Sequence, residues 1–160
     1  MFNAISITAV PVLDQDEALD FYVGKLGFTV TNDVDMGFMR WLTIALPADP
    51  ERHLLLEVPG PPALSDEVAQ QVRSLVTKGA LGVACILTTS DCQTTFETLR
   101  ERGVEFTQEP VTQPYGTDCA IRDPFGNHIR ITQPGTGPAT ITDDDIARWS
   151  EGAKERLASD

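Results

Sequence analysis

The sequence predicts an α+β fold in which two βαβββ modules form curved mixed sheets around a cleft, followed by a C-terminal helix. Strand-like and helix-like segments follow the same order in residues 1–58 and in residues 81–133. The glycines expected to end the two helices, Gly27 and Gly103, are separated by almost the same number of residues as the aspartates expected to start them, Asp14 and Asp91. A fixed period of this kind indicates an internal repeat.

A strand and a helix open the first module. Residues 5–12 are a β-branched run that predicts a strand, and Pro11 favours an edge position or a strand end because proline has no N–H to donate to a ladder. Asp14 marks the expected helix start, since acidic residues favour helix N-termini. Apolar residues then recur at helical spacing as far as residue 26, and Gly27 is placed to end the helix.

Three strands complete the first module, and a linker follows it. The expected strands are residues 28–32, 40–46 and 53–58, which turn-forming residues separate. Proline and glycine occupy residues 59–62, and a short helix is expected over residues 68–76. We therefore interpret residues 59–80 as the connection between the modules.

The second module repeats this order and leads into a tail. Its expected strands are residues 81–88, 104–107, 119–122 and 129–132. Asp91 is suited to cap the helix that ends at Gly103. Residues 134–160 form a linker and a helix that begins at Thr142, and Trp149 is expected to dock this helix on the body. The apolar stripe of the tail helix consists of Ile146, Trp149, Ala153 and Leu157.

Composition restricts the possible partners and the compartment. The formal net charge is -12, and a field of this sign repels phosphate backbones, so we expect no nucleic-acid partner. No apolar run approaches the roughly 18 residues of a membrane span, and the N-terminus lacks the pattern of a secretory signal. These features predict a cytoplasmic protein without a membrane partner. The three cysteines lack CxxC spacing, which argues against a disulfide framework or a structural zinc site.

Three motifs resemble one known family. Residues 12–28 are similar to the pattern V-x-D-x-x-x-A-x-x-F-Y-x-x-x-L-G-F, residues 99–106 to L-x-x-x-G-V-x-F, and residues 123–127 to the turn D-P-x-G-N. Their order and spacing resemble the vicinal-oxygen-chelate superfamily of glyoxalases, bleomycin-resistance proteins and extradiol dioxygenases. The resemblance covers about residues 5–133 and implies the two-module fold, whereas it says far less about activity.

The resemblance also implies where a catalytic metal would be bound. The superfamily takes ligands from the first and last strand of each module, and these positions fall on Ile7, Glu57, Ala84 and Arg130. One carboxylate does not hold a divalent ion that needs three or four donors. We therefore expect no metal and no cofactor. A different cluster of His53, Glu57 and His128 is conceivable only if their strands meet.

A cleft without a metal can still bind a ligand. Glu57 and Arg130 are expected to face one cavity, where they either pair with each other or contact the ligand. Aromatic and charged residues near the same strands would suit a flat organic molecule, although core packing is an alternative for each aromatic residue. The predicted ligand-binding residues are Phe38, Arg40, Trp41, Glu57, Tyr115, His128 and Arg130.

Three functions agree with these features. The first is a small-molecule binding protein, similar to the drug-sequestering branch of the superfamily, acting as a homodimer without a metal. The second is a lyase, isomerase or dioxygenase of this superfamily with a noncanonical metal site, or with metal-free acid–base catalysis by Glu57 or His128. The third is a regulatory module that contacts a partner through the tail helix. The sequence leaves open whether the modules pair within one chain or between two.

Overall fold

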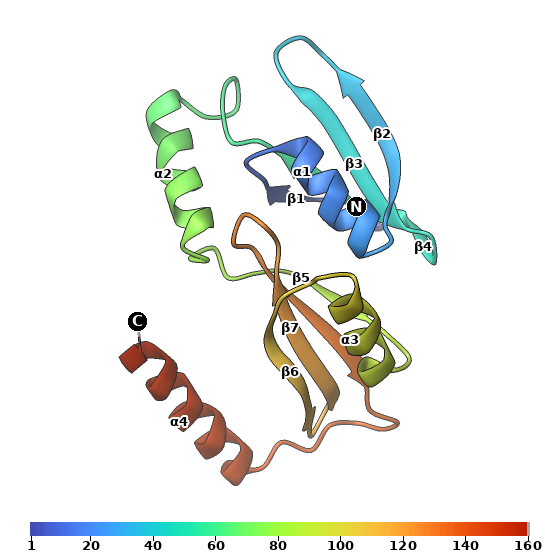
Figure 1. Ribbon diagram of the computed structural model, residues 1–160, viewed down its shortest axis with the longest axis vertical. Helices are drawn as coiled ribbons and strands as arrows, with labels where there is room; N and C mark the ends of the chain where they lie inside the picture. The colour runs from blue at the N-terminus through green and yellow to red at the C-terminus, as the bar shows by residue number, and fades with distance from the viewer. Residues whose placement is uncertain (160) are drawn as a thin grey trace.

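The computed structural model describes residues 1–159, with side chains as far as Lys154, and confirms the predicted α+β fold of two βαβββ modules (Figure 1). Each module contains one four-stranded mixed sheet. The strand order is β1-β4-β3-β2 in the first sheet and β5-β8-β7-β6 in the second. In both sheets the first and last strands of the module run parallel, and the other neighbours are antiparallel.

The first module has the helix start and the helix end that the sequence predicts. Its elements are β1 (Ile7–Pro11), α1 (Gln15–Leu19), the π-helical segment η1 (Asp20–Lys25), β2 (Thr29–Asp35), β3 (Arg40–Leu46) and β4 (Asp49–Glu57). The Asp14 carboxylate accepts hydrogen bonds from the first free N–H groups of α1, those of Asp16 and Glu17, each at 2.9 Å. Gly27 has a φ of 83°, which a glycine adopts without strain where the chain leaves the helix.

The second module repeats this aspartate cap and this terminal glycine. Its elements, with the preceding helix and the tail, are α2 (Asp66–Thr77), β5 (Val83–Thr88), α3 (Cys92–Glu101), β6 (Phe106–Gln113), β7 (Gly116–Arg122), β8 (His128–Pro134) and α4 (Asp143–Ser159). Asp91 accepts a hydrogen bond from the N–H of Thr94 at 2.9 Å, and Gly103 has a φ of 72°. The repeat is therefore present in the caps as well as in the order of elements.

Strands β2, β4, β6, β7 and β8 extend beyond the bounds that the sequence predicts, and in β4 and β6 the added residues include an internal proline. Strand β4 begins at Asp49, which pairs with Leu46 across a two-residue turn, so Pro50 lies at the start of the strand before its pairing with β1 begins. Strand β6 extends to Gln113 and includes Pro110, which lies at the edge of its sheet beside a shift in register. A proline costs little at a strand start or a sheet edge, because no ladder hydrogen bond is lost there.

The two sheets share one hydrophobic core. The core includes Leu42, Ile44 and Leu56 from the first sheet and Ile121 and Ile129 from the second. Tyr22 of η1 and Leu99 of α3 belong to the same cluster. Each sheet therefore turns its helix-covered face towards this common core. The opposite face of each sheet points outwards, and we call it the open face.

Polar contacts across the core join the modules. The buried Tyr22 hydroxyl donates to Asp123 at 2.9 Å, and the side-chain amide of Asn127 donates to the carbonyl of Pro11 at 2.8 Å. Burial and the neighbouring Asp123 carboxylate raise the pKa of Tyr22, so the phenol remains protonated and able to donate. The Asp-Pro-Phe-Gly-Asn turn of the second module is thus bonded to the first module.

The tail helix extends away from the body. Trp149 contacts the β6–β7 hairpin, as expected, whereas Ile146 of the predicted apolar stripe is 53% exposed. Leu157 lies among the residues whose side chains are outside the described part of the chain. Among residues 1–159, none of the helices combines the length and the apolar character that crossing a membrane requires.

Candidate functional site

The open face of the first sheet combines an aromatic side chain, hydroxyl groups and one carboxylate. Side chains alternate along a strand, and Leu42, Ile44 and Leu56 point into the core. Their neighbours therefore point to the open face. These are Trp41 and Thr43 on β3, and His53, Leu55 and Glu57 on β4.

Hydrogen bonds hold the hydroxyl groups of this face in place. Thr31 contacts the Thr43 hydroxyl at 2.8 Å and the Nδ1 atom of His53 at 3.0 Å. Thr43 is almost fully buried, so its hydroxyl needs these partners. His53 is therefore occupied within the first sheet rather than directed towards a metal ligand set.

The open face of the second sheet contains a buried ion pair. Asp118 on β7 is fully buried, and its carboxylate contacts the guanidinium of Arg130 on β8. Gln108 on β6 also donates to Asp118 at 3.4 Å. The Arg130 side chain is 32% exposed, and a guanidinium carries five N–H donors. Arg130 can therefore hold Asp118 and still donate a hydrogen bond to a ligand.

Arg130 and Glu57 do not form the charged pair that was one expectation for this chain. They lie on the open faces of different sheets, and these faces point away from the shared core. The partner of Arg130 is Asp118, which sequence reasoning missed. A signal was present, because Asp118 is a charged residue directly before the apolar run Cys119–Ile121, two residues from the β7 position that pairs with Arg130. The register needed to use that signal comes only from the structure.

Phe38 and Arg40 lie at the rim of the first module. They line a hollow of about 170 Å³ that also includes Gln15, Pro59 and Arg73. The guanidinium of Arg40 is bidentate to Asp33 at 2.7 and 2.8 Å and also donates to Asp16 of α1 at 2.7 Å. Arg40 thus points to the helix side of β3, whereas Trp41 points to the open face. The structure does not bring these two predicted residues onto one surface.

Tyr115 and His128 are also separated from the first sheet. Tyr115 lies in the β6–β7 turn, and its ring centroid is 6.4 Å from that of Trp149. His128 begins β8 and packs against Gly79, where a Cβ atom would come within 2.8 Å of its Nε2 atom. Burial and the charge of Arg122 lower the pKa of His128, which favours the neutral imidazole. Within one chain, the predicted ligand-binding residues therefore divide between the two open faces and the module rim.

The side chains at the family's metal positions do not fit a divalent ion. Ile7 and Ala84 are aliphatic, and Arg130 is a cation paired with Asp118. Glu57 is the one donor at these positions. The alternative cluster of His53, Glu57 and His128 divides between two sheets, and residues 1–159 contain no group of three or more His, Cys, Asp or Glu side chains placed to hold a metal.

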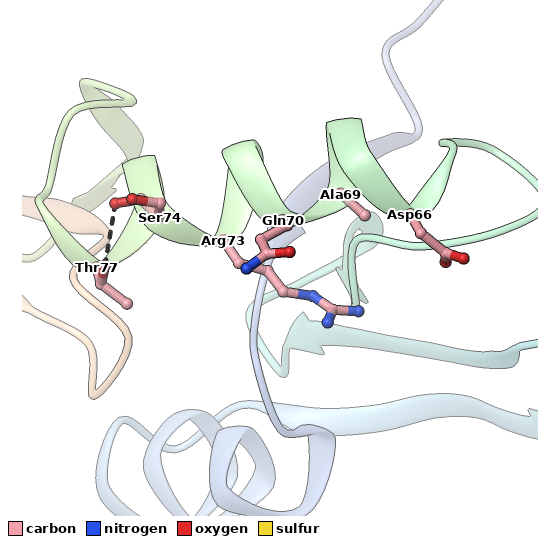
Figure 2. Close-up of a pocket in the computed structure, with 6 residues that line it drawn as sticks. All are labelled: Asp66, Ala69, Gln70, Arg73, Ser74 and Thr77. Carbon is pink, nitrogen blue, oxygen red and sulfur yellow. Dashed lines mark hydrogen bonds between the residues drawn. The ribbon is translucent and has the colours of Figure 1, made fainter.

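One surface hollow lies along α2 and is a poor candidate for a specific site. Asp66, Gln70, Arg73, Ser74 and Thr77 line it, with a volume of about 630 Å³. Figure 2 shows that all of these side chains come from one helix, so no second element provides an opposing wall. Arg73 is engaged with the carbonyl of Pro59 at 2.7 Å. The Thr77 hydroxyl donates to the carbonyl of Ser74 at 3.0 Å (Figure 2).

A second hollow, of about 380 Å³, lies between the modules. Thr8, Phe28 and Leu54 of the first module and Cys85 and Leu87 of the second contribute to its lining. These residues lie where the edge strands β1 and β5 approach each other. The charged and imidazole groups in its lining already have partners, since Arg52 pairs with Asp49 at 3.2 Å and His53 contacts Thr31 at 3.0 Å. The open faces therefore remain the stronger candidates.

Comparison with known proteins gives one family. The model of the "Glyoxalase/Bleomycin resistance protein/Dioxygenase superfamily" matches residues 4–131. The uncharacterized protein YurT of Bacillus subtilis (strain 168) is 38% identical over 130 residues, which cover 81% of this chain and 98% of YurT. The family match ends before α4.

Two solved structures resemble this chain in sequence as well as in fold. UcmS2 is 41% identical with a TM-score of 0.78, and the match covers 83% of this chain and 99% of UcmS2. TnmS3, described as an antibiotic binding protein from Streptomyces sp. CB03234, is 30% identical with a TM-score of 0.66, covering 84% of this chain and 98% of TnmS3.

Proposed function

The chain belongs to the glyoxalase/bleomycin resistance protein/dioxygenase superfamily, and on this premise we propose that it is a bleomycin-resistance-like protein that binds a small organic molecule without the usual metal. One observation carries the proposal. The open faces present an aromatic ring, hydroxyl groups and charged groups, while the residues at the metal positions do not fit an ion. A surface of this kind can bind and orient a ligand but has no Lewis acid of its own. The description of TnmS3 as an antibiotic binding protein supports the same class of function.

The proposed cleft needs a second copy of the chain. The open faces point outwards, so one chain does not enclose the space between Glu57 and Arg130. We propose a homodimer in which the open face of the first module meets the open face of the partner's second module. The exposed apolar residues Ile7 of β1 and Ile86 of β5 alternate with core residues and so point to the open faces, which supports this arrangement. Exposed apolar side chains on a sheet face favour association.

Light scattering at micromolar concentration is expected to give twice the mass of the chain. Ile86→Glu should shift the protein towards the monomer, because a charge would be buried where an apolar side chain pairs. Ile141→Glu is the matched control, since Ile141 is similarly exposed but lies in the linker before α4. A clean monomer over a wide concentration range would contradict the dimer, as would equal effects of the two variants.

The chemistry of the first open face indicates the class of ligand. Trp41 offers a flat apolar surface, Thr31 offers a hydroxyl group that Thr43 holds in place, and Glu57 offers a carboxylate at the end of β4. The net charge of -12 further favours neutral or cationic molecules over anionic ones. We therefore expect a largely apolar molecule with a planar ring and a few polar groups.

A thermal-shift screen with bleomycin, the planar dye proflavine and the planar ketone 3-hydroxyflavone tests the proposed function. A compound at 100 times its Kd should stabilise the protein by about 2.7 kcal/mol. Trp41→Ala should raise the Kd of a compound that binds at this face by about tenfold, because a stacked aromatic ring is lost. Leu75→Ala on the exposed side of α2 should leave that Kd unchanged. Stabilisation by divalent metal instead of by these compounds would favour the alternative of an enzyme.

A further inference from the structure

The tail helix α4 contacts the second sheet through Trp149, at the β6–β7 hairpin. Gln113 on β6 pairs with Gly116 on β7, two residues before Asp118, so Gln113 shares the face of the buried ion pair. The indole N–H of Trp149 donates to the Gln113 side chain at 3.1 Å. Figure 1 shows α4 on the side of β6 and β7 away from α3. Trp149 is therefore held beside the face that we propose forms the cleft, while the rest of α4 extends away from the body.

The start of α4 is fixed by a reciprocal cap. The N–H of Asp145 donates to the Thr142 hydroxyl at 3.2 Å, and the N–H of Thr142 donates back to the Asp145 carboxylate at 3.0 Å. Arg148 adds a contact to Asp145 at 2.7 Å. This arrangement is a capping box, which sets the direction in which a helix leaves its first turn. Trp149 then lies about two turns further along, on the side that meets the sheet.

Trp149 and Arg130 lie above the same stretch of β7. The Arg130 guanidinium is at Asp118, and Trp149 is at Gln113, opposite Gly116. Two residues of a strand span about 7 Å, which is the length of a small ring system. On β7 the side chains of this face are small on either side of Asp118, at Gly116 and Ala120, and Val111 of β6 and Thr132 of β8 lie beside Asp118 on the same face.

We propose that α4 completes a binding site on the second open face, in which Trp149 and Tyr115 contact a planar ring and Arg130 donates to a keto or hydroxyl oxygen of that ring system. The two aromatic rings are adjacent, with centroids 6.4 Å apart and planes tilted by 49°. Arg130 keeps free donors for an oxygen acceptor, as its 32% exposure allows. The inference rests on the proposed function. The family match ends at residue 131, so α4 adds a wall to what the family provides and would determine which ligands fit.

Fluorescence titration of the full chain with 3-hydroxyflavone tests this proposal, because the probe is a planar ring ketone with its own emission. Trp149→Ala should raise the Kd about tenfold, whereas Trp149→Phe keeps a ring and should raise it less than threefold. Ile146→Ala is the matched control on the same helix. Its side chain is 53% exposed, so the Kd should stay within twofold of the parent value.

The outcomes separate this inference from the function on which it rests. If the parent chain binds the probe and Trp149→Ala binds it equally well, the role of α4 is wrong and the proposed function stands. If the parent binds another compound of the thermal-shift panel but not 3-hydroxyflavone, the ring-ketone assignment is wrong. If the parent binds none of these compounds, the proposed function fails as well. If Trp149→Ala dissociates the dimer in light scattering, α4 holds the second copy and the proposal is overturned.

Discussion

Asp123→Ala is expected to lower the free energy of unfolding by about 4 kcal/mol, although Asp123 has no proposed contact with a ligand. Its carboxylate is 4% exposed and accepts the backbone N–H groups of Phe125, Gly126 and Asn127 at 2.8–3.0 Å. It also accepts the Tyr22 hydroxyl at 2.9 Å and the Asn127 amide at 2.7 Å. Alanine would leave these donors without their acceptor in a buried turn, and each unsatisfied donor is costly.

Urea denaturation of the parent and two variants measures this effect. Tyr22→Phe removes one of the hydrogen bonds and keeps the ring, so it should cost about 1 kcal/mol. The slope with denaturant should stay the same, since the surface exposed on unfolding does not change. A loss below 1.5 kcal/mol for Asp123→Ala would show that water replaces the carboxylate, contrary to this account of the turn.

Arg130→Met is expected to cost about 3 kcal/mol, the second-largest effect. It leaves the fully buried Asp118 without its cation, although methionine fills much of the same volume. We place the cost at the low end for broken buried pairs because the Arg130 side chain is one-third exposed and retains some solvent screening.

The double variant Arg130→Met with Asp118→Leu separates the ion pair from the packing. Removing both charges should recover most of the lost stability, because the cost comes from burying an unpaired carboxylate. If the double variant is as unstable as Arg130→Met alone, the arginine acts through packing and not through its charge. A double-mutant cycle by chemical denaturation gives the coupling directly.

The sequence predicted the features of the fold that are local. Asp14 and Asp91 cap their helices, Gly27 and Gly103 end them, and the strand over residues 40–46 has the predicted bounds. Each of these depends on a few neighbouring residues and on the chemistry of one backbone position. Strand lengths were predicted less well, because whether a strand continues, through Pro50 in β4 or Pro110 in β6 for example, depends on its pairing with a neighbouring strand.

Less of the candidate site could be predicted, because its geometry depends on contacts distant in sequence. Alternation along β3 was enough to separate Arg40 from Trp41, but which face meets the core is decided by the packing of α1. The Asp118–Arg130 pair depends on the register of β7 with β8. The separation of Glu57 from Arg130 depends on how the two sheets share a core, which no strand pattern contains.

The shared core has a consequence for how the chain can fold. The helix-covered faces of both sheets bury their apolar residues against the same cluster, so neither half has a complete interior of its own. A half-chain ending near residue 80 would lose the part of this core that the second module contributes, together with the hydrogen bond from Tyr22 to Asp123. The two modules therefore repeat in structure, but we do not expect either module to be stable by itself. We expect the two halves to fold and unfold together in a single cooperative transition.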